Sequence, residues 1–163
     1  MTTLREIPPQ EAQPDDADLL LVETAAGTRT TTRGNLLKNA RTETTIISDT
    51  ILNGEIAMVT FAMPRSVEIL AVTSSGPARI RLYSTINAQF NDVIRAITTR
   101  PTAGAGIILE TIHETAGTIN LDPHAHGSNM ENPPAPELYA TITNTGDTAA
   151  LTVTLTYLER EHP

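Results

Sequence analysis

The sequence predicts a mainly β protein: an antiparallel β-sandwich of the jelly-roll kind, preceded by a small N-terminal β-hairpin and a short helix. Threonine makes up about one residue in six, and β-branched side chains favour strands. Apolar and polar residues alternate with the period of a half-buried strand in several segments. Turn residues separate these segments at the spacing typical of sandwiches and jelly rolls.

The composition divides the chain into an N-terminal arm and attachment element, residues 1–40, and a β-sandwich domain, residues 41–163. Prolines and acidic residues predict an extended arm over residues 1–17. Strands are expected at 18–23 and 28–32 around an Ala-Ala-Gly turn, followed by a short helix at 34–40. Because this region is too small to bury its own leucines, we expect them to dock on a partner surface.

The clearest alternation lies in Ala78–Tyr83. Ala78, Ile80 and Leu82 share one face, which we expect to be buried. Arg79, Arg81 and Tyr83 share the other face, which we expect to contact water.

Further strands are expected at 107–112 and 118–121, and a strand at 138–143 is expected to pair with 151–157 across the hairpin signal Asn144–Asp147. Ser74–Pro77 is predicted to be a similar hairpin turn. Glu55–Met63 and Ser66–Thr73 are apolar on both faces, which indicates central or interface-buried strands. Residues 84–99 fit the spacing of a short helix about as well as a strand and a loop. Residues 122–136 are predicted to form a long loop, a common place for contacts.

The composition excludes several classes of function. The chain has no cysteine, which excludes disulfides, thiolate metal sites and a cysteine nucleophile. Its net charge of −8 disfavours binding to nucleic acid, whose affinity comes from cations placed near phosphates. No apolar run is long enough to span a bilayer, and the first residues do not resemble a signal peptide. We therefore expect a soluble protein that is made in the cytoplasm and does not insert into membranes.

No motif in the chain predicts catalysis. Phosphate-binding glycine loops and the GxSxG elbow of serine hydrolases are both missing. The acidic pairs Asp15/Asp16 and Glu159/Glu161 lie near the termini, where they could not hold two carboxylates across a substrate. The sequence thus predicts no catalytic residue, no cofactor and no enzyme activity.

Two histidine motifs have ligand chemistry to consider. His124 and His126 form an HxH pair, and in extended backbone both imidazoles would point to the same face. Two ligands per chain do not close a metal site, but three such pairs on the axis of a trimer could bind one divalent metal. Exposed loop histidines are the simpler interpretation. His113-Glu114 is expected to be a surface turn, because neighbours in a strand point to opposite faces.

Four arginines lie close together in the chain: Arg79, Arg81, Arg95 and Arg100. They are candidates for a cationic patch that binds an acidic glycan or a neighbouring subunit. Arginine is the usual cation of protein interfaces. We therefore expect Arg79 and Arg81 to form ion pairs between subunits.

A resemblance to a known family begins at Ala17. The stretch from Ala17 to Leu37, ADLLLVETAAGTRTTTRGNLL, resembles the N-terminal element of many phage tail-fibre and tailspike proteins, and the remainder resembles the small β-sandwiches of fibre and baseplate proteins. The resemblance implies a structural protein of the virion, synthesised in the host cytoplasm, which packs as a homotrimer and attaches to other virion proteins. It implies docking through Leu19, Leu21, Leu36 and Leu37.

Two other functions stay open from the sequence. A capsid decoration or head-completion protein would share the arm and the sandwich. A carbohydrate-binding sandwich would use Tyr83, Tyr139 and Tyr157 as stacking residues. The sequence does not decide between tail and head, fix the oligomer number, or show whether a host glycan or receptor binds at residues 122–136.

Overall fold

The computed structural model describes residues 19–24, 27–32 and 41–160. The chain divides into two units, residues 1–39 and 40–163. In the first unit, β1 (Leu19–Thr24) and β2 (Gly27–Thr32) form an antiparallel hairpin with Leu19 opposite Thr32. This confirms the predicted N-terminal hairpin. The helix predicted at 34–40, with Leu36 and Leu37, lies outside the described residues.

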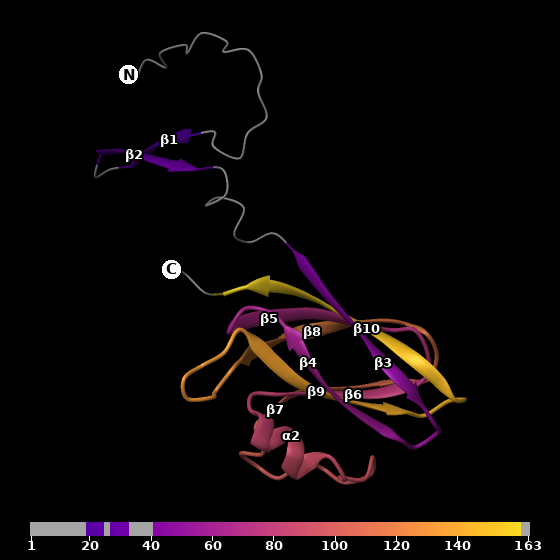
Figure 1. The fold of residues 1–163 in the computed structure, drawn as a ribbon. Helices are drawn as coiled ribbons and strands as arrows, with labels where there is room; N and C mark the ends of the chain where they lie inside the picture. The colour runs from indigo at the N-terminus through magenta and orange to yellow at the C-terminus, as the bar shows by residue number, and fades with distance from the viewer. Residues whose placement is uncertain (1–18, 25–26, 33–40, 161–163) are drawn as a thin grey trace. The chain divides into compact units, whose positions relative to one another are not determined.

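The second unit is a β-sandwich of two four-stranded antiparallel sheets (Figure 1). In chain order its strands are β3 (Thr42–Ile51), β4 (Ile56–Ala62), β5 (Ser66–Ser74), β6 (Ala78–Tyr83), β7 (Ile107–His113), β8 (Gly117–Ser128), β9 (Glu137–Asn144) and β10 (Ala149–Glu159). The first sheet has the order β3-β10-β5-β8, and the second has the order β4-β9-β6-β7. This is the strand order of a jelly roll, and it confirms the predicted mainly β fold.

Nearly every connection in the sandwich passes from one sheet to the other. Only β6 and β7 follow one another in the same sheet, where they pair antiparallel. The predicted hairpin across Asn144–Asp147 is therefore wrong, because β9 and β10 lie in different sheets. The turn at Ser74–Pro77 likewise connects the sheets and is not a hairpin. Turn residues signal a reversal of the chain, but they do not show which strand will pair with which.

The core lies between the two sheets. Every second residue of β10 points inward, including Val153 and Leu155, and Ile80 and Leu82 of β6 approach from the opposite sheet; all four are fully buried. Full burial of an aliphatic side chain of this size stabilises the fold by roughly 1.5–3 kcal/mol. In β6 and β10, alternation in the sequence therefore correctly predicts which face meets the core.

Two strands differ from their predicted positions. Ser66–Thr73 corresponds to β5, which is central as expected, but Glu55–Met63 corresponds to β4, which lies at the edge of its sheet, and its burial in an interface stays a prediction. The loop predicted at 122–136 begins later, because β8 continues to Ser128 and pairs with β5 through His126 and Gly127. β8 is an edge strand, and its solvent-facing residues are polar like those of a loop. Its second half was therefore predicted as loop.

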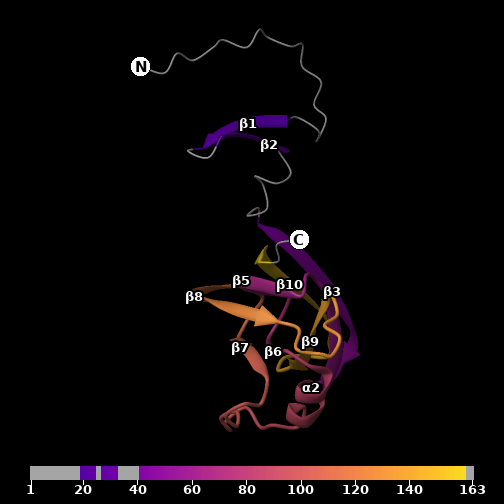
Figure 2. The same ribbon diagram turned by 90° about the vertical axis from the view of Figure 1, so that its left-hand side faces the viewer.

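The helix α2 (Ile86–Asp92) lies in the long connection between β6 and β7 and confirms the helical alternative for residues 84–99. It contacts β6 and β9 on the outer side of the second sheet. Figure 2 shows the two sheets and α2 as successive layers. Helix α2 and the segment that follows it therefore cover the face of β6 that carries Arg79 and Arg81.

Candidate functional site

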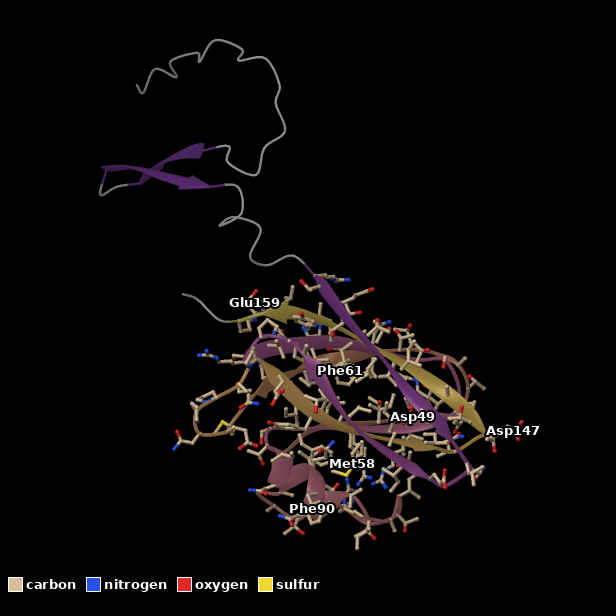
Figure 3. All side chains as sticks on the ribbon, viewed as in Figure 1. Asp49, Met58, Phe61, Phe90, Asp147 and Glu159 are labelled. Carbon is tan, nitrogen blue, oxygen red and sulfur yellow. The ribbon has the colours of Figure 1, made fainter. Side chains whose placement is uncertain are left out.

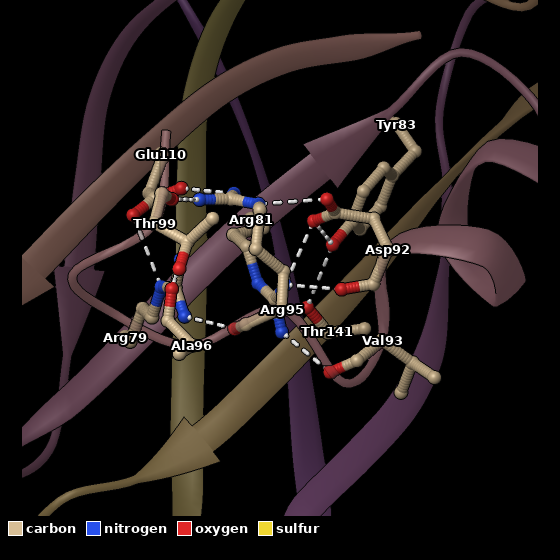
Figure 4. Close-up of polar contacts among 10 residues, drawn as sticks. All are labelled: Arg79, Arg81, Tyr83, Asp92, Val93, Arg95, Ala96, Thr99, Glu110 and Thr141. Atoms are coloured by element: carbon tan, nitrogen blue, oxygen red, sulfur yellow. Dashed lines mark hydrogen bonds and ion pairs between the residues drawn. The ribbon is translucent and has the colours of Figure 1, made fainter. Parts of the chain in front are cut away.

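The most elaborate polar structure in the described residues is a buried group of charged side chains on the outer face of β6. We call it the arginine cluster, and its members are Arg79, Arg81, Asp92, Arg95 and Glu110 (Figure 4). Arg79 and Arg81 alternate on β6, Glu110 lies on the paired strand β7, and Asp92 and Arg95 come from the end of α2 and the turn after it. The alternation of side chains on β6 and the packing of α2 on that strand thus bring five charged side chains together.

Ion pairs connect all members of the cluster. Arg81 Nη1 lies 2.7 Å from Asp92 Oδ2, and Arg79 Nε lies 3.0 Å from Glu110 Oε1. Arg95 joins these two pairs, because its Nε lies 2.7 Å from Asp92 Oδ1 and its Nη2 contacts Glu110 Oε2. Buried ion pairs need such additional partners to offset the loss of hydration.

Backbone carbonyls accept further hydrogen bonds from the arginines. Arg81 donates to the carbonyls of Asp92 at 2.6 Å and Val93 at 3.1 Å, and Arg79 donates to the carbonyl of Arg95 at 2.7 Å. These carbonyls lie at and just beyond the C-terminal end of α2, where unpaired carbonyls carry partial negative charge. The guanidinium groups of β6 therefore hold the end of the helix on the sheet.

Tyr83 extends the cluster along β6. Its hydroxyl donates to Asp92 Oδ2 at 2.9 Å and lies 3.2 Å from Thr141 Oγ1 on β9. Burial raises the pKa of Tyr83 to about 12. Burial also opposes ionisation of Asp92, but hydrogen bonds from Arg95, Tyr83 and Arg81 outweigh it and hold the pKa of Asp92 below its usual value.

The same balance applies to Glu110. Its partial burial disfavours the charged form, but hydrogen bonds from Arg79 and Arg95 outweigh this effect and lower the pKa of its carboxyl. At neutral pH both acids are thus ionised and Tyr83 is protonated. None of these groups has the pKa near 7 that a general acid or base needs. The arrangement is suited to binding α2 rather than to proton transfer.

The prediction that Arg79, Arg81 and Tyr83 face water is wrong. Arg79 is 3% exposed, and Arg81 and Tyr83 are fully buried. Both arginines form their ion pairs within the chain, so the geometry gives no support to the predicted ion pairs between subunits. Asp92 and Glu110 were not predicted as members of the site, although the spacing of Asp92 and Arg95 by one helical turn is a signal for a local ion pair.

The arginines expected to form a cationic patch separate into two groups. Arg95 joins Arg79 and Arg81 in the buried cluster, whereas Arg100 is exposed in the following loop. Asp92 and Glu110 offset much of the buried positive charge. The result is a buried ionic network and not an open cationic surface.

The tyrosines proposed for carbohydrate stacking are not available at the surface. Tyr139 is 6% exposed, Tyr157 is 5% exposed and Tyr83 is fully buried. Stacking on a sugar requires an open aromatic face. This observation removes the residues on which the carbohydrate-binding alternative depended.

The predicted HxH pair lies in strand β8, with both side chains exposed. His124 Nδ1 is 2.8 Å from Glu68 Oε1, and Arg160 contacts the other oxygen of Glu68. Within residues 41–160 no three His, Asp or Glu side chains are placed to hold a metal ion. A metal bound by His124 and His126 across an oligomer axis stays a prediction.

His113 is not in a surface turn. It is the last residue of β7, is 3% exposed, and has its Nε2 atom 3.4 Å from Thr111 Oγ1. Burial lowers the pKa of its imidazole. Glu114 is exposed, so the two side chains do not form an acid and base pair.

A second feature of α2 was not expected from the sequence. Its buried side chains are Gln89 and Asp92, whereas Ile86 and Phe90, one helical turn apart, are 51% and 69% exposed. Ile94 is 88% exposed and Ile97 is 48% exposed. Ile86 and Phe90 lie on α2, and Ile94 and Ile97 lie in the segment after it; we call these four exposed side chains the α2 apolar surface. Figure 3 shows Phe90 on α2 and Phe61, by contrast, between the sheets.

The docking residues predicted in the first unit are described only in part. Leu19 and Leu21 lie in β1, and the structure describes their backbone but not their side chains. Leu36 and Leu37 lie outside the described residues. Docking through these four leucines therefore stays a prediction.

Comparisons with known proteins identify no family. No protein-family model and no curated protein matches the chain. Among solved structures, the chain is similar to a de novo designed double-stranded β-helix determined by solution NMR, with 14% identity, a TM-score of 0.32, and coverage of 71% of this chain and 97% of that chain. Among the described residues, no helix has the length and apolar character needed to cross a membrane.

Proposed function

We propose that the protein is a non-enzymatic structural component of a tailed-phage particle: a tail-fibre, collar or baseplate protein that attaches through its N-terminal segment and self-associates as a homotrimer. The α2 apolar surface is the observation that carries the self-association. The phage assignment comes from the resemblance of residues 17–37 to tail-fibre attachment elements, and the β1–β2 hairpin has the strand and turn pattern of that resemblance.

The α2 apolar surface supports an interface because α2 turns its apolar side toward solvent, whereas an ordinary surface helix turns that side toward the core. Here the arginine cluster and Gln89 hold the polar side against the sheet, and Gln89 Nε2 donates to the carbonyl of Ala140 at 2.5 Å. Ile86 and Phe90 lie one turn apart on the outer side of the helix, and exposed apolar side chains that lie together are typical of protein interfaces.

A second copy of the chain is the partner that fits this surface best. The four side chains carry no charge, so contact between two copies at these residues places no like charges directly opposite each other. This replaces Arg79 and Arg81 as the residues we expect at the subunit interface. The capsid decoration alternative shares the same requirement, and the location on the particle distinguishes it.

The mass in solution tests the self-association. We expect light scattering to give three chains for the full-length protein and one chain for the double variant Phe90→Ser/Ile94→Ser, because each substitution removes apolar area from the interface. The control is Ile47→Ser, which changes an isoleucine that is 67% exposed on β3 and should leave the mass unchanged. A monomeric wild-type protein, or a double variant that stays trimeric, contradicts the proposed interface.

Electron microscopy of antibody-labelled phage particles tests the location. Label on the tail, collar or baseplate supports the proposal. Label on the capsid surface favours the decoration alternative. Particles without label contradict a virion protein of either kind.

A further inference from the structure

The turn between β3 and β4 contains the dipeptide Asn53-Gly54, and no other asparagine of the sequence is followed by glycine. Both residues are exposed. The amide of Glu55 donates to the carbonyl of Leu52 at 3.0 Å, and Gly54 has a φ of +81°. A positive φ at the third position is that of a type II turn, which glycine adopts without strain. The turn therefore places an asparagine side chain next to the backbone amide of a glycine.

Asparagine before glycine can lose its side-chain amide in a reaction that needs only water. The backbone nitrogen of the glycine loses its proton and attacks Cγ of the asparagine, ammonia leaves, and a succinimide ring forms. Water then opens the ring at either carbonyl, which gives aspartate or isoaspartate with one new negative charge. Asparagine is among the thermolabile residues of proteins, and glycine favours the attack because it has no Cβ atom beside its nitrogen.

In the folded chain both reacting groups are held by the β9–β10 turn, residues 144–147. The attacking nitrogen, Gly54 N, donates to the carbonyl of Asn144 at 2.7 Å. The side chain to be attacked is also bound, because Asn53 Nδ2 donates to the carbonyl of Gly146 at 2.9 Å. An amide N–H that donates to a carbonyl does not release its proton to water until that hydrogen bond opens. The reaction therefore requires the contact between the two turns to open.

The side chain of Asn144 determines the shape of the β9–β10 turn. Asn144 is 1% exposed, and its Nδ2 atom donates to the carbonyls of Ile51 at 2.9 Å and Asp147 at 2.8 Å. Its Oδ1 atom accepts a hydrogen bond from the amide of Gly146 at 2.8 Å. Because Ile51 is the last residue of β3, Asn144 connects the two turns. The frequency with which their contact opens therefore depends on this side chain.

We propose that Asn53-Gly54 is a site of spontaneous deamidation, and that the succinimide forms only in molecules in which the contact with the β9–β10 turn has opened. The product loosens the same contact. A carboxylate at position 53 has no proton to donate to the carbonyl of Gly146, and isoaspartate adds one carbon to the backbone of the turn. Converted chains therefore lose a hydrogen bond between the two connections and gain one negative charge.

Peptide mapping by mass spectrometry tests the site. The full-length protein is incubated at one mildly alkaline pH, either folded or unfolded in guanidinium chloride, and the loss of the Asn53 amide is followed with time. We expect conversion in both states, with a rate at least roughly tenfold lower in the folded protein, since only the open fraction reacts. The control Asn53→Gln keeps an amide but forms the larger ring far more slowly. An unfolded chain that keeps the Asn53 amide, or equal rates in the two states, overturns the proposal.

The variant Asn144→Ala tests the control of the rate. Loss of its three side-chain hydrogen bonds should raise the conversion rate of the folded protein roughly fivefold or more, because the contact then opens more often. Asn120→Ala changes an exposed asparagine of β8 and should leave the rate unchanged. Circular dichroism establishes that each variant is folded. A folded Asn144→Ala protein that converts no faster than the wild type contradicts the proposal.

Hydrogen exchange of the wild-type protein decides the question when Asn144→Ala does not fold. The N–H of Gly54 exchanges with solvent only when the same contact opens. The factor by which folding slows this exchange should therefore equal, within about threefold, the factor by which folding slows deamidation. Two factors that differ by more than this would show that another step controls the reaction.

Discussion

At the scale of single residues, Asp92 is the acid of the arginine cluster that contacts the most side chains. Its carboxylate accepts hydrogen bonds from Arg81, Tyr83 and Arg95, which come from two different parts of the chain. Arg81 and Tyr83 are fully buried, and the Arg95 side chain is 9% exposed, so water cannot replace Asp92 as their hydrogen-bond acceptor at low cost. The side chain therefore determines whether the polar layer between β6 and α2 is stable.

Replacing Asp92 tests this role. In Asp92→Asn the shape is kept, but three guanidinium groups then face one carboxylate. Removing one partner of a buried ion pair typically costs about 3–5 kcal/mol, and we expect a loss of that size in the free energy of unfolding measured with urea. The control Asp147→Asn changes an exposed acid and should stay within about 0.5 kcal/mol. A loss below about 1 kcal/mol for Asp92→Asn would show that the cluster contributes little.

Residue types alone could not predict this cluster. Alternation in Ala78–Tyr83 separates the core face from the face that carries Arg79 and Arg81, and that separation is confirmed. Whether the second face contacts water depends on which other part of the chain packs on it. Residues 86–97 pack on it, and this contact exists only in the folded protein. Ion pairs between residues distant in sequence, such as Arg79 and Glu110, leave no periodic signal.

At the scale of elements, α2 shows why a helical pattern can be correct while its orientation stays undetermined. The apolar spacing of Ile86, Phe90 and Ile94 predicts a helix, and a helix forms at Ile86–Asp92. Periodicity defines two sides but not which side is buried. In this protein the ionic partners on β6 bind the polar side, and the apolar side remains exposed.

The start of this helix provides the prediction at this scale. Thr85 is the N-cap, and its hydroxyl accepts a hydrogen bond from the amide of Ala88 at 3.0 Å. We expect Thr85→Ala to cost about 1 kcal/mol of unfolding free energy, which is typical for loss of an N-cap. Thr98→Ala, an exposed threonine after the helix, serves as the control and should change stability by less than about 0.5 kcal/mol. Equal effects of the two substitutions would argue against a contribution from the cap.

At the scale of the whole molecule, the sandwich could be predicted because burial along a strand alternates with a period of two residues. The pairing of the strands could not be predicted. Leu151, Val153 and Leu155 indicate a strand with one buried face whether β10 pairs with β9 or with β3 and β5. The jelly-roll order places sequence neighbours in opposite sheets. Only contacts over long sequence distances distinguish this order from a series of hairpins.

Among the described residues, the buried apolar core of the sandwich lies between Ile51 and Tyr157, within the second unit. We therefore expect the fragment 41–163 to fold alone, with the circular dichroism spectrum of a β-sandwich and a melting temperature within roughly 3 °C of the full chain, a shift of less than about 1 kcal/mol for a domain of this size. Since the α2 apolar surface lies in this fragment, the fragment should also keep the number of chains in the full-length oligomer. A folded but monomeric fragment would shift the self-association to the N-terminal leucines, Leu19 and Leu21 among them, and an unfolded fragment would show that the sandwich depends on residues 1–40.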